Sequence, residues 1–126
     1  MTKHETRTHA LISASRIQRA SLCPGSVLAE EAMPPEPASA AAMRGTIIHE
    51  LSEHLLAGRD LPEGADPELV EVAKTYVKAL DDFTQNIKRE YIELSVTDAL
   101  KTIHESLGGT ADYVGTGGGE IVIADL

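Results

Sequence analysis

The 126-residue sequence has few of the residues on which several common classes of protein depend. Its single cysteine, Cys23, excludes an intramolecular disulfide. The polar start at residues 1–9 has no apolar core of a signal peptide, so we expect a cytoplasmic protein. No apolar run reaches the roughly 20 residues that cross a bilayer, so we expect no membrane partner. Aromatic residues make up 3% of the chain and tryptophan is absent, which argues against a base-stacking surface.

Basic residues are also scarce. The chain has 11 Lys and Arg against 20 Asp and Glu, and seven of the basic residues share residues 29–126 with nineteen acidic ones. This composition argues against a protein that binds nucleic acid by neutralising phosphates with its own side chains. It is compatible with an enzyme that contacts phosphate through a divalent metal ion, because carboxylates are the ligands that such an ion prefers.

The length and the 42% apolar content favour one domain, which we expect to be incomplete, over 1–126. Its expected parts are an N-terminal arm with short helices (1–37), a helical part (38–87) and a sheet part with the acidic residues (88–126). Ser39 is a good N-cap for a helix that reaches about residue 57, and Asp66-Pro67 begin another. Apolar residues on this second helix recur at helical spacing, at Leu69, Ala73, Tyr76, Val77, Leu80, Phe83 and Ile87. A shorter helix over 14–22 should turn Ile17, Ala20 and Leu22 inward.

After residue 88 the pattern changes to the alternation typical of strands. Strands are expected at 91–96, 107–116 and 120–126, with a connection between the first two. The expected fold is α/β, with N-terminal helices followed by an antiparallel β-meander. The chain ends inside the last strand, so we expect a fragment or a truncated product.

A hairpin turned at Gly118-Gly119 would place Asp112 opposite Asp125 on an apolar face with Val114, Ile121 and Ile123. Residues on the other face are also apolar, so we expect both faces to be covered. Two facing carboxylates that are desolvated repel each other unless one is protonated or a cation binds. Oxygen ligands at this spacing suit Mg2+ or Mn2+. The alternative is a shifted register that leaves one aspartate at a frayed chain end.

Glu93 is expected on the neighbouring strand, on the face opposite Ile92 and Leu94. It is either a third oxygen ligand or a solvated strand residue.

His49 lies at one border of the apolar arc of its helix and His54 at the other border, about 140° away. The two histidines therefore cannot bind one metal ion from a single helix face, and their spacing does not match the metalloprotease motif. From the residues alone, His49 is a structural or solvated histidine or a ligand. Cys23 is a buried apolar residue or a cluster ligand, and one cysteine cannot hold an iron–sulfur cluster by itself.

Four stretches in this order resemble the start of a phage-type RecB-like nuclease of the PD-(D/E)XK superfamily. They are HALISASRIQRASLCPGS (9–26), MRGTIIHELSEHLL (43–56), ESLGGTADYV (105–114) and EIVIADL (120–126). The joint pattern is Cys-Pro-Gly-Ser, Gly-Thr-x-x-His-Glu, Gly-Gly-Thr-Ala-Asp and a hydrophobic run into Asp-Leu. The resemblance covers almost the whole chain.

The resemblance implies a restriction-endonuclease-like core and a metal-dependent deoxyribonuclease. It implies that His49, Asp112 and Asp125 bind Mg2+ or Mn2+, that Asp112 and Asp125 are catalytic, and that Glu93 is a further acidic contributor. The last motif of the family is Asp-x-Lys, and its lysine would fall after Leu126, so we expect low activity from residues 1–126.

The expected function is therefore the N-terminal part of a nuclease that hydrolyses phosphodiesters in phage-type DNA recombination or processing. DNA is the expected partner, with other recombination or phage proteins as further ones. An inactive module that binds nucleic acid or protein is the first alternative. A small acidic metal-binding protein with no nucleic-acid role is the second.

Overall fold

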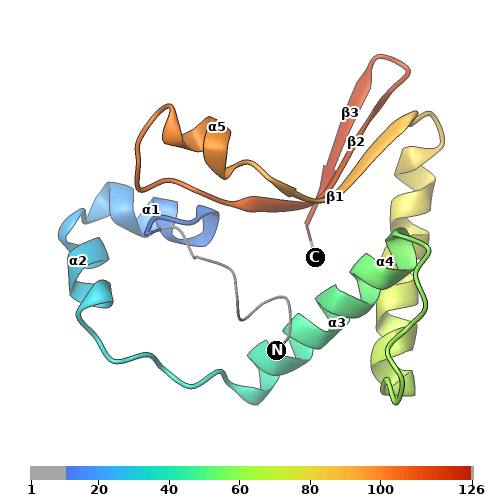
Figure 1. The fold of residues 1–126 in the computed structure, drawn as a ribbon, viewed down its shortest axis with the longest axis horizontal. Helices are drawn as coiled ribbons and strands as arrows, with labels where there is room; N and C mark the ends of the chain where they lie inside the picture. The colour runs from blue at the N-terminus through green and yellow to red at the C-terminus, as the bar shows by residue number, and fades with distance from the viewer. Residues whose placement is uncertain (1–10, 126) are drawn as a thin grey trace. The chain divides into compact units, whose positions relative to one another are not determined.

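The computed structural model describes residues 11–125, and the chain divides into two compact units. One unit runs to Glu36 and includes Ser95–Thr110, and the other comprises Pro37–Leu94 and Ala111–Leu126. Within the described residues, no helix is both long enough and apolar enough to cross a membrane. Helices come first and a three-stranded antiparallel sheet follows, which confirms the expected fold class (Figure 1).

The first unit contains three short helices, α1 (Ala14–Leu22), α2 (Gly25–Glu31) and α5 (Thr97–Lys101). An ion pair between Arg19 and Glu30 joins α1 to α2, and a parallel bridge joins Ile12 to Leu107. The expected inward face of α1 is wrong, since Ile17 and Leu22 are 53% and 81% exposed. Their spacing is helical, but no element covers that stripe among the residues that the structure describes. Cys23 is exposed, so its expected burial is wrong as well.

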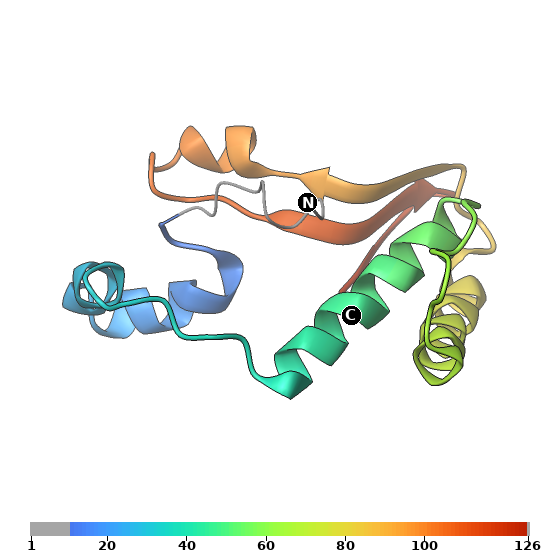
Figure 2. The ribbon, with the colours of Figure 1, turned by 60° about the horizontal axis from the view of Figure 1, so that its bottom comes forward.

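Two longer helices form the helical layer of the second unit. In α3 (Ala40–Leu56) the Ser39 side chain accepts a hydrogen bond from the amide of Ala42, and in α4 (Pro67–Thr84) Asp66 accepts from the amide of Glu68. Both caps match the sequence prediction. The two helices pack against each other, as Figure 2 shows, around a core of Leu51, Leu69, Val70 and Ala73. This core fixes the position of α3, the helix that carries His49.

The sheet has the strand order β1 (Arg89–Ser95), β2 (Thr110–Gly117) and β3 (Glu120–Ala124). Gly118 and Gly119 both have positive φ, which is the geometry that a two-residue hairpin turn of type I′ requires. Five residue pairs run from Gly117 opposite Glu120 to Tyr113 opposite Ala124. This is the register that the sequence predicted for these five pairs, and the expected pair of Asp112 and Asp125 lies one step beyond the last of them.

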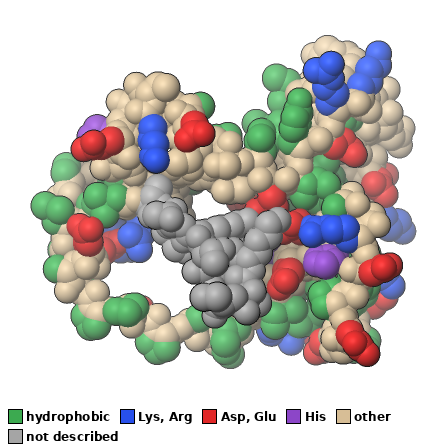
Figure 3. All heavy atoms as spheres, viewed as in Figure 1, with side chains coloured by type: hydrophobic (Ala, Val, Ile, Leu, Met, Phe, Trp, Pro, Cys, Tyr) green, Lys and Arg blue, Asp and Glu red, His purple; other side chains and the backbone are tan. Residues whose placement is uncertain are grey.

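The prediction that both faces of the hairpin are covered is wrong. Tyr113 and Gly115 are buried, whereas Ile121 and Ile123 are each 71% exposed. Hydrophobic side chains are visible at the surface along this hairpin in Figure 3. In β2 and β3 the observed register agrees with the alternation of apolar residues. The alternation could not show which face the described helices cover.

Candidate metal centre

His49 reaches the site from the middle of α3. Its side chain is 20% exposed, and its two ring nitrogens face two different carboxylates. Nε2 pairs with Oε1 of Glu93, and Nδ1 lies 3.4 Å from Oδ2 of Asp112. The prediction that His49 points toward the strand carboxylates is therefore confirmed for Asp112, and a solvated His49 is excluded.

Glu93 reaches the same point through an unusual backbone conformation. Its φ is +58°, and among residues 11–125 it is the one residue other than glycine with a positive φ. That region costs an L-residue with a Cβ roughly 1–2 kcal/mol. Such outliers persist where the surroundings hold them, and they cluster at functional sites.

The strained residue also breaks the alternation of β1. Ile92, Glu93 and Leu94 are all partly buried, and both Ile92 and Glu93 line one pocket. The prediction that Glu93 lies on the face opposite Ile92 is therefore wrong. The side chain of Glu93 is only 8% exposed, so it is not a solvated strand residue.

Asp112 completes the cluster from β2, with its side chain 15% exposed. One ligand atom each from His49, Glu93 and Asp112 can be chosen so that all three lie within 4.8 Å of one another. One helix and two strands thus direct a nitrogen and two carboxylate groups to one point. Two carboxylates and an imidazole suit a divalent ion such as Mn2+, since carboxylates favour hard cations and imidazole binds transition metals.

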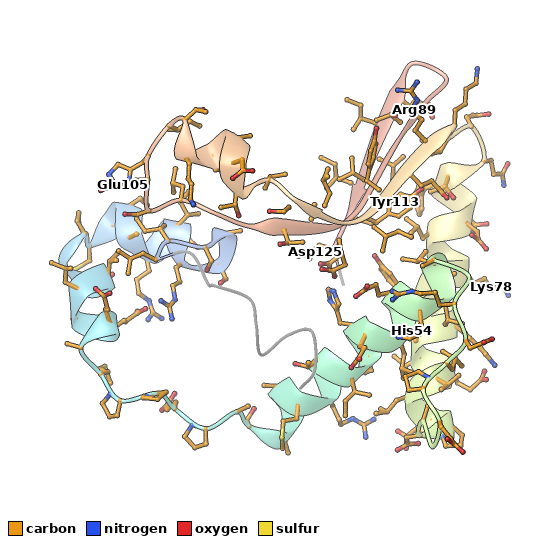
Figure 4. The ribbon with its side chains drawn as sticks, in the orientation of Figure 1. His54, Lys78, Arg89, Glu105, Tyr113 and Asp125 are labelled. Carbon is orange, nitrogen blue, oxygen red and sulfur yellow. The ribbon has the colours of Figure 1, made fainter. Side chains whose placement is uncertain are left out.

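Asp125 stands apart from this three-residue group. It is exposed, and it follows the last residue of β3. Figure 4 shows it at the end of β3, on the side toward α3, while His54 lies near the C-terminal end of that helix. The structure therefore brings together three of the four expected site residues. Glu93, expected either as a third oxygen ligand or as a solvated strand residue, lies in this group, and Asp125 does not.

The cluster forms one wall of a small pocket that is open to solvent. Its other lining residues come from α3, α4 and β1, and they are Ser52, Glu53, Leu56, Tyr76 and Ile92. Ser52 donates a hydrogen bond to the carbonyl of Ile48, and Glu53 forms an ion pair with Arg59 at 2.6 Å. His54 is not part of this lining, because its Nδ1 pairs with the carbonyl of Asp60 at 2.6 Å.

Two of these lining residues were missed in the sequence. Glu53 lies four residues after His49, a spacing that places both on one face of a helix, and this signal could have identified it. Tyr76 was assigned to the apolar stripe of its helix, where its hydroxyl group was the one polar atom. Burial raises the pKa of Tyr76, and the charges of Asp112 and Asp125 raise it further. Tyr76 therefore lies near both aspartates and keeps its proton.

Searches of curated proteins and of solved structures gave no significant match. The family described as "Protein of unknown function (DUF2800)" matches residues 9–126. Because this match covers nearly the whole sequence, the chain belongs to that family.

Proposed function

We propose that this chain carries the metal centre of a deoxyribonuclease and that His49, Glu93 and Asp112 bind Mg2+ or Mn2+ there. The observation that carries the proposal is the convergence of these three side chains from α3, β1 and β2. The strained backbone at Glu93 supports it, since folding alone gives no reason to hold a carboxylate in that conformation. The resemblance to RecB-like nucleases supplies the reaction, phosphodiester hydrolysis in phage-type DNA recombination or processing in a bacterial cytoplasm.

The donor set explains how an acidic protein can act on an anionic polymer. A divalent ion bound here would supply the Lewis acidity that polarises a phosphodiester and favours ionisation of the attacking water. His49 offers one ring nitrogen while the other keeps its contact with a carboxylate. Glu93 and Asp112 offset the charge of the ion. Asp125, which directly follows β3, is not one of the three proposed ligands.

Metal binding is the first test, because it does not depend on turnover. In isothermal titration calorimetry with Mn2+, we expect one site in the wild-type protein and at least a 100-fold weaker site in Glu93→Gln and Asp112→Asn. Each substitution removes an anionic ligand and keeps the shape of the side chain. Asp98→Asn on α5 is a matched control, since it removes one carboxylate in the other unit. Equal Mn2+ affinity in all four proteins would contradict the proposed centre.

Cleavage is the second test. With Mn2+ present, we expect slow hydrolysis of DNA that Asp112→Asn reduces by about 100-fold or more, which corresponds to about 2.7 kcal/mol of lost transition-state stabilisation. If Mn2+ binds and DNA binds without any cleavage, the inactive binding module is the better description of this chain.

A further inference from the structure

Tyr76 lines the pocket and is a polar residue that is not part of the proposed metal centre. Its hydroxyl oxygen is buried, and it is the one buried side-chain nitrogen or oxygen among the described residues without a hydrogen-bond partner. A buried polar group left in this state costs roughly 1–3 kcal/mol. Native proteins keep such a group where water, an ion or a ligand completes its hydrogen bonding.

The other polar residues that line the pocket are already engaged. The hydroxyl of Ser52 donates to a backbone carbonyl, Glu53 pairs with Arg59, and the nitrogens of His49 face two carboxylates. The carboxylates themselves can only accept hydrogen bonds when they are ionised. Tyr76 is thus the lining residue with a donor left for an incoming group.

The chemistry of the phenol determines which group that is. A neutral phenol has an O–H group that donates a hydrogen bond. A donor beside a divalent cation is complementary to an anionic oxygen, and a phosphate offers several such oxygens around one centre.

We propose that the Tyr76 hydroxyl donates a hydrogen bond to a phosphate oxygen of the nucleic-acid substrate, beside the ion held by His49, Glu93 and Asp112. This inference rests on the proposed function and adds to it a substrate-binding residue from α4.

The test compares the three tyrosines of the chain, which differ in exposure and in the partner of the hydroxyl group. The hydroxyl of Tyr76 is buried without a partner, Tyr91 is 42% exposed, and Tyr113 is buried with its hydroxyl donating to Glu90 at 2.7 Å. Tyr76→Phe removes only the proposed donor, and Tyr91→Phe is the matched control. The probes are Mn2+ alone and then thymidine 5′-monophosphate at saturating Mn2+, both measured by calorimetry.

For Tyr76→Phe we expect Mn2+ affinity within twofold of the wild type and nucleotide affinity about tenfold weaker or more, as for a lost hydrogen bond to a charged group. Tyr91→Phe should change neither. The melting temperature of Tyr76→Phe without ligand should be no lower than that of the wild type, because no protein partner is lost and a buried hydroxyl without a partner is removed. Loss of affinity then does not reflect loss of structure.

The outcomes separate this inference from the proposed metal centre. If Mn2+ binds and Tyr76→Phe binds the nucleotide as well as the wild type does, or if the wild type does not bind it, the role of Tyr76 is wrong and the metal centre stands. If Mn2+ does not bind but Tyr76→Phe still weakens nucleotide binding, the metal centre is wrong and the donor stands. If the wild type binds neither probe, both are wrong.

A second measurement does not require a variant that folds. Wild-type protein labelled with 3-fluorotyrosine has three fluorine positions, and the resonance of Tyr76, whose hydroxyl has no protein partner, should shift when thymidine 5′-monophosphate is added. The resonance of Tyr91 should stay in place. A nucleotide that binds without moving the Tyr76 resonance would overturn the inference.

Discussion

Glu93 combines two costs at one residue, a positive φ and a carboxylate withdrawn from solvent. Neither cost is needed to form a strand, since an ordinary extended residue would continue β1 without them. The strand β1 is therefore irregular at Glu93, and the carboxylate of this residue lies beside His49. This is the pattern expected where a site, rather than the fold, determines the residue.

The strain at Glu93 can be measured by comparing two substitutions that both remove the side chain. Glu93→Gly should be more stable than Glu93→Ala by about 1 kcal/mol in metal-free urea unfolding, because glycine adopts a positive φ without steric cost. The lost contact with His49 is common to both variants and cancels. At Tyr91, in the same strand, the order should be the usual one, with alanine the more stable by about 0.5–1 kcal/mol. The same order at both positions would contradict a strained Glu93.

Because Tyr113 is buried, we expect the free energy of unfolding to depend on pH in alkaline solution. It is 1% exposed, and burial followed by its hydrogen bond to Glu90 raises its pKa above the ordinary value near 10. Above about pH 10 the unfolded chain loses this proton while the folded chain keeps it. The free energy of unfolding should therefore fall as pH rises, by about 1.4 kcal/mol per pH unit for one such group.

Tyr113→Phe removes this proton from both states. In urea titrations from pH 8 to 11, the variant should be less stable at neutral pH by about 1–2 kcal/mol, since the bond to Glu90 is lost. It should also lose stability less steeply above pH 10. Parallel pH profiles for the variant and the wild type would show that the phenol of Tyr113 is not protected by the fold.

At the scale of elements, the hairpin of β2 and β3 joins the helical layer through a close backbone contact. A Cβ added at Gly117 would lie 2.5 Å from both the carbonyl oxygen of Asn86 and the amide nitrogen of Lys88. The amide of Lys88 also donates to the carbonyl of Thr116 at 2.9 Å. The segment that leads from α4 into β1 therefore lies directly against the hairpin, and no side chain fits between them.

Gly117→Ala should accordingly destabilise the protein by about 2 kcal/mol or more, because backbone atoms cannot move away as a flexible side chain could. Gly45→Ala is the matched control. Gly45 lies inside α3, and apart from its neighbours in the helix no atom lies within 4 Å of the added Cβ, so alanine there should stabilise by about 0.5–1 kcal/mol. Urea unfolding measures both effects. A Gly117→Ala variant as stable as the wild type would show that the two segments are not in contact.

The elements also show what the sequence could and could not predict. Ser39 and Asp66 are local signals that marked helix starts correctly, and Gly118-Gly119 determined the hairpin register and hence the place of Asp112. The orientation of Glu93 could not be predicted, because a positive φ at a glutamate has no sequence signature. The exposure of Phe83, Ile121 and Ile123 depends on which surfaces the helices cover, and periodicity does not contain that information.

For the whole molecule, the proposed ion would connect parts of the chain that are distant in sequence. His49 and Glu93 are separated by 44 residues, and Asp112 follows on a third element. With a net charge of −9, the chain also gains from any cation that offsets its carboxylates. Binding at one centre and general screening of charge would both stabilise the folded chain. The two are distinguished by which elements become more stable.

Hydrogen exchange makes this distinction. At a Mn2+ concentration 100 times the dissociation constant, a specific site stabilises the folded state by about 2.7 kcal/mol. We expect this gain as slower amide exchange, by up to about 100-fold, in α3, β1 and β2, which supply the ligands. Amides of α1 and α2 belong to the other compact unit and should exchange at unchanged rates.

In Glu93→Gln the same Mn2+ concentration should protect none of these elements. Equal protection in the wild type and Glu93→Gln would mean that the ion binds elsewhere among the carboxylates, and protection that extends to α1 and α2 would contradict the division into two units.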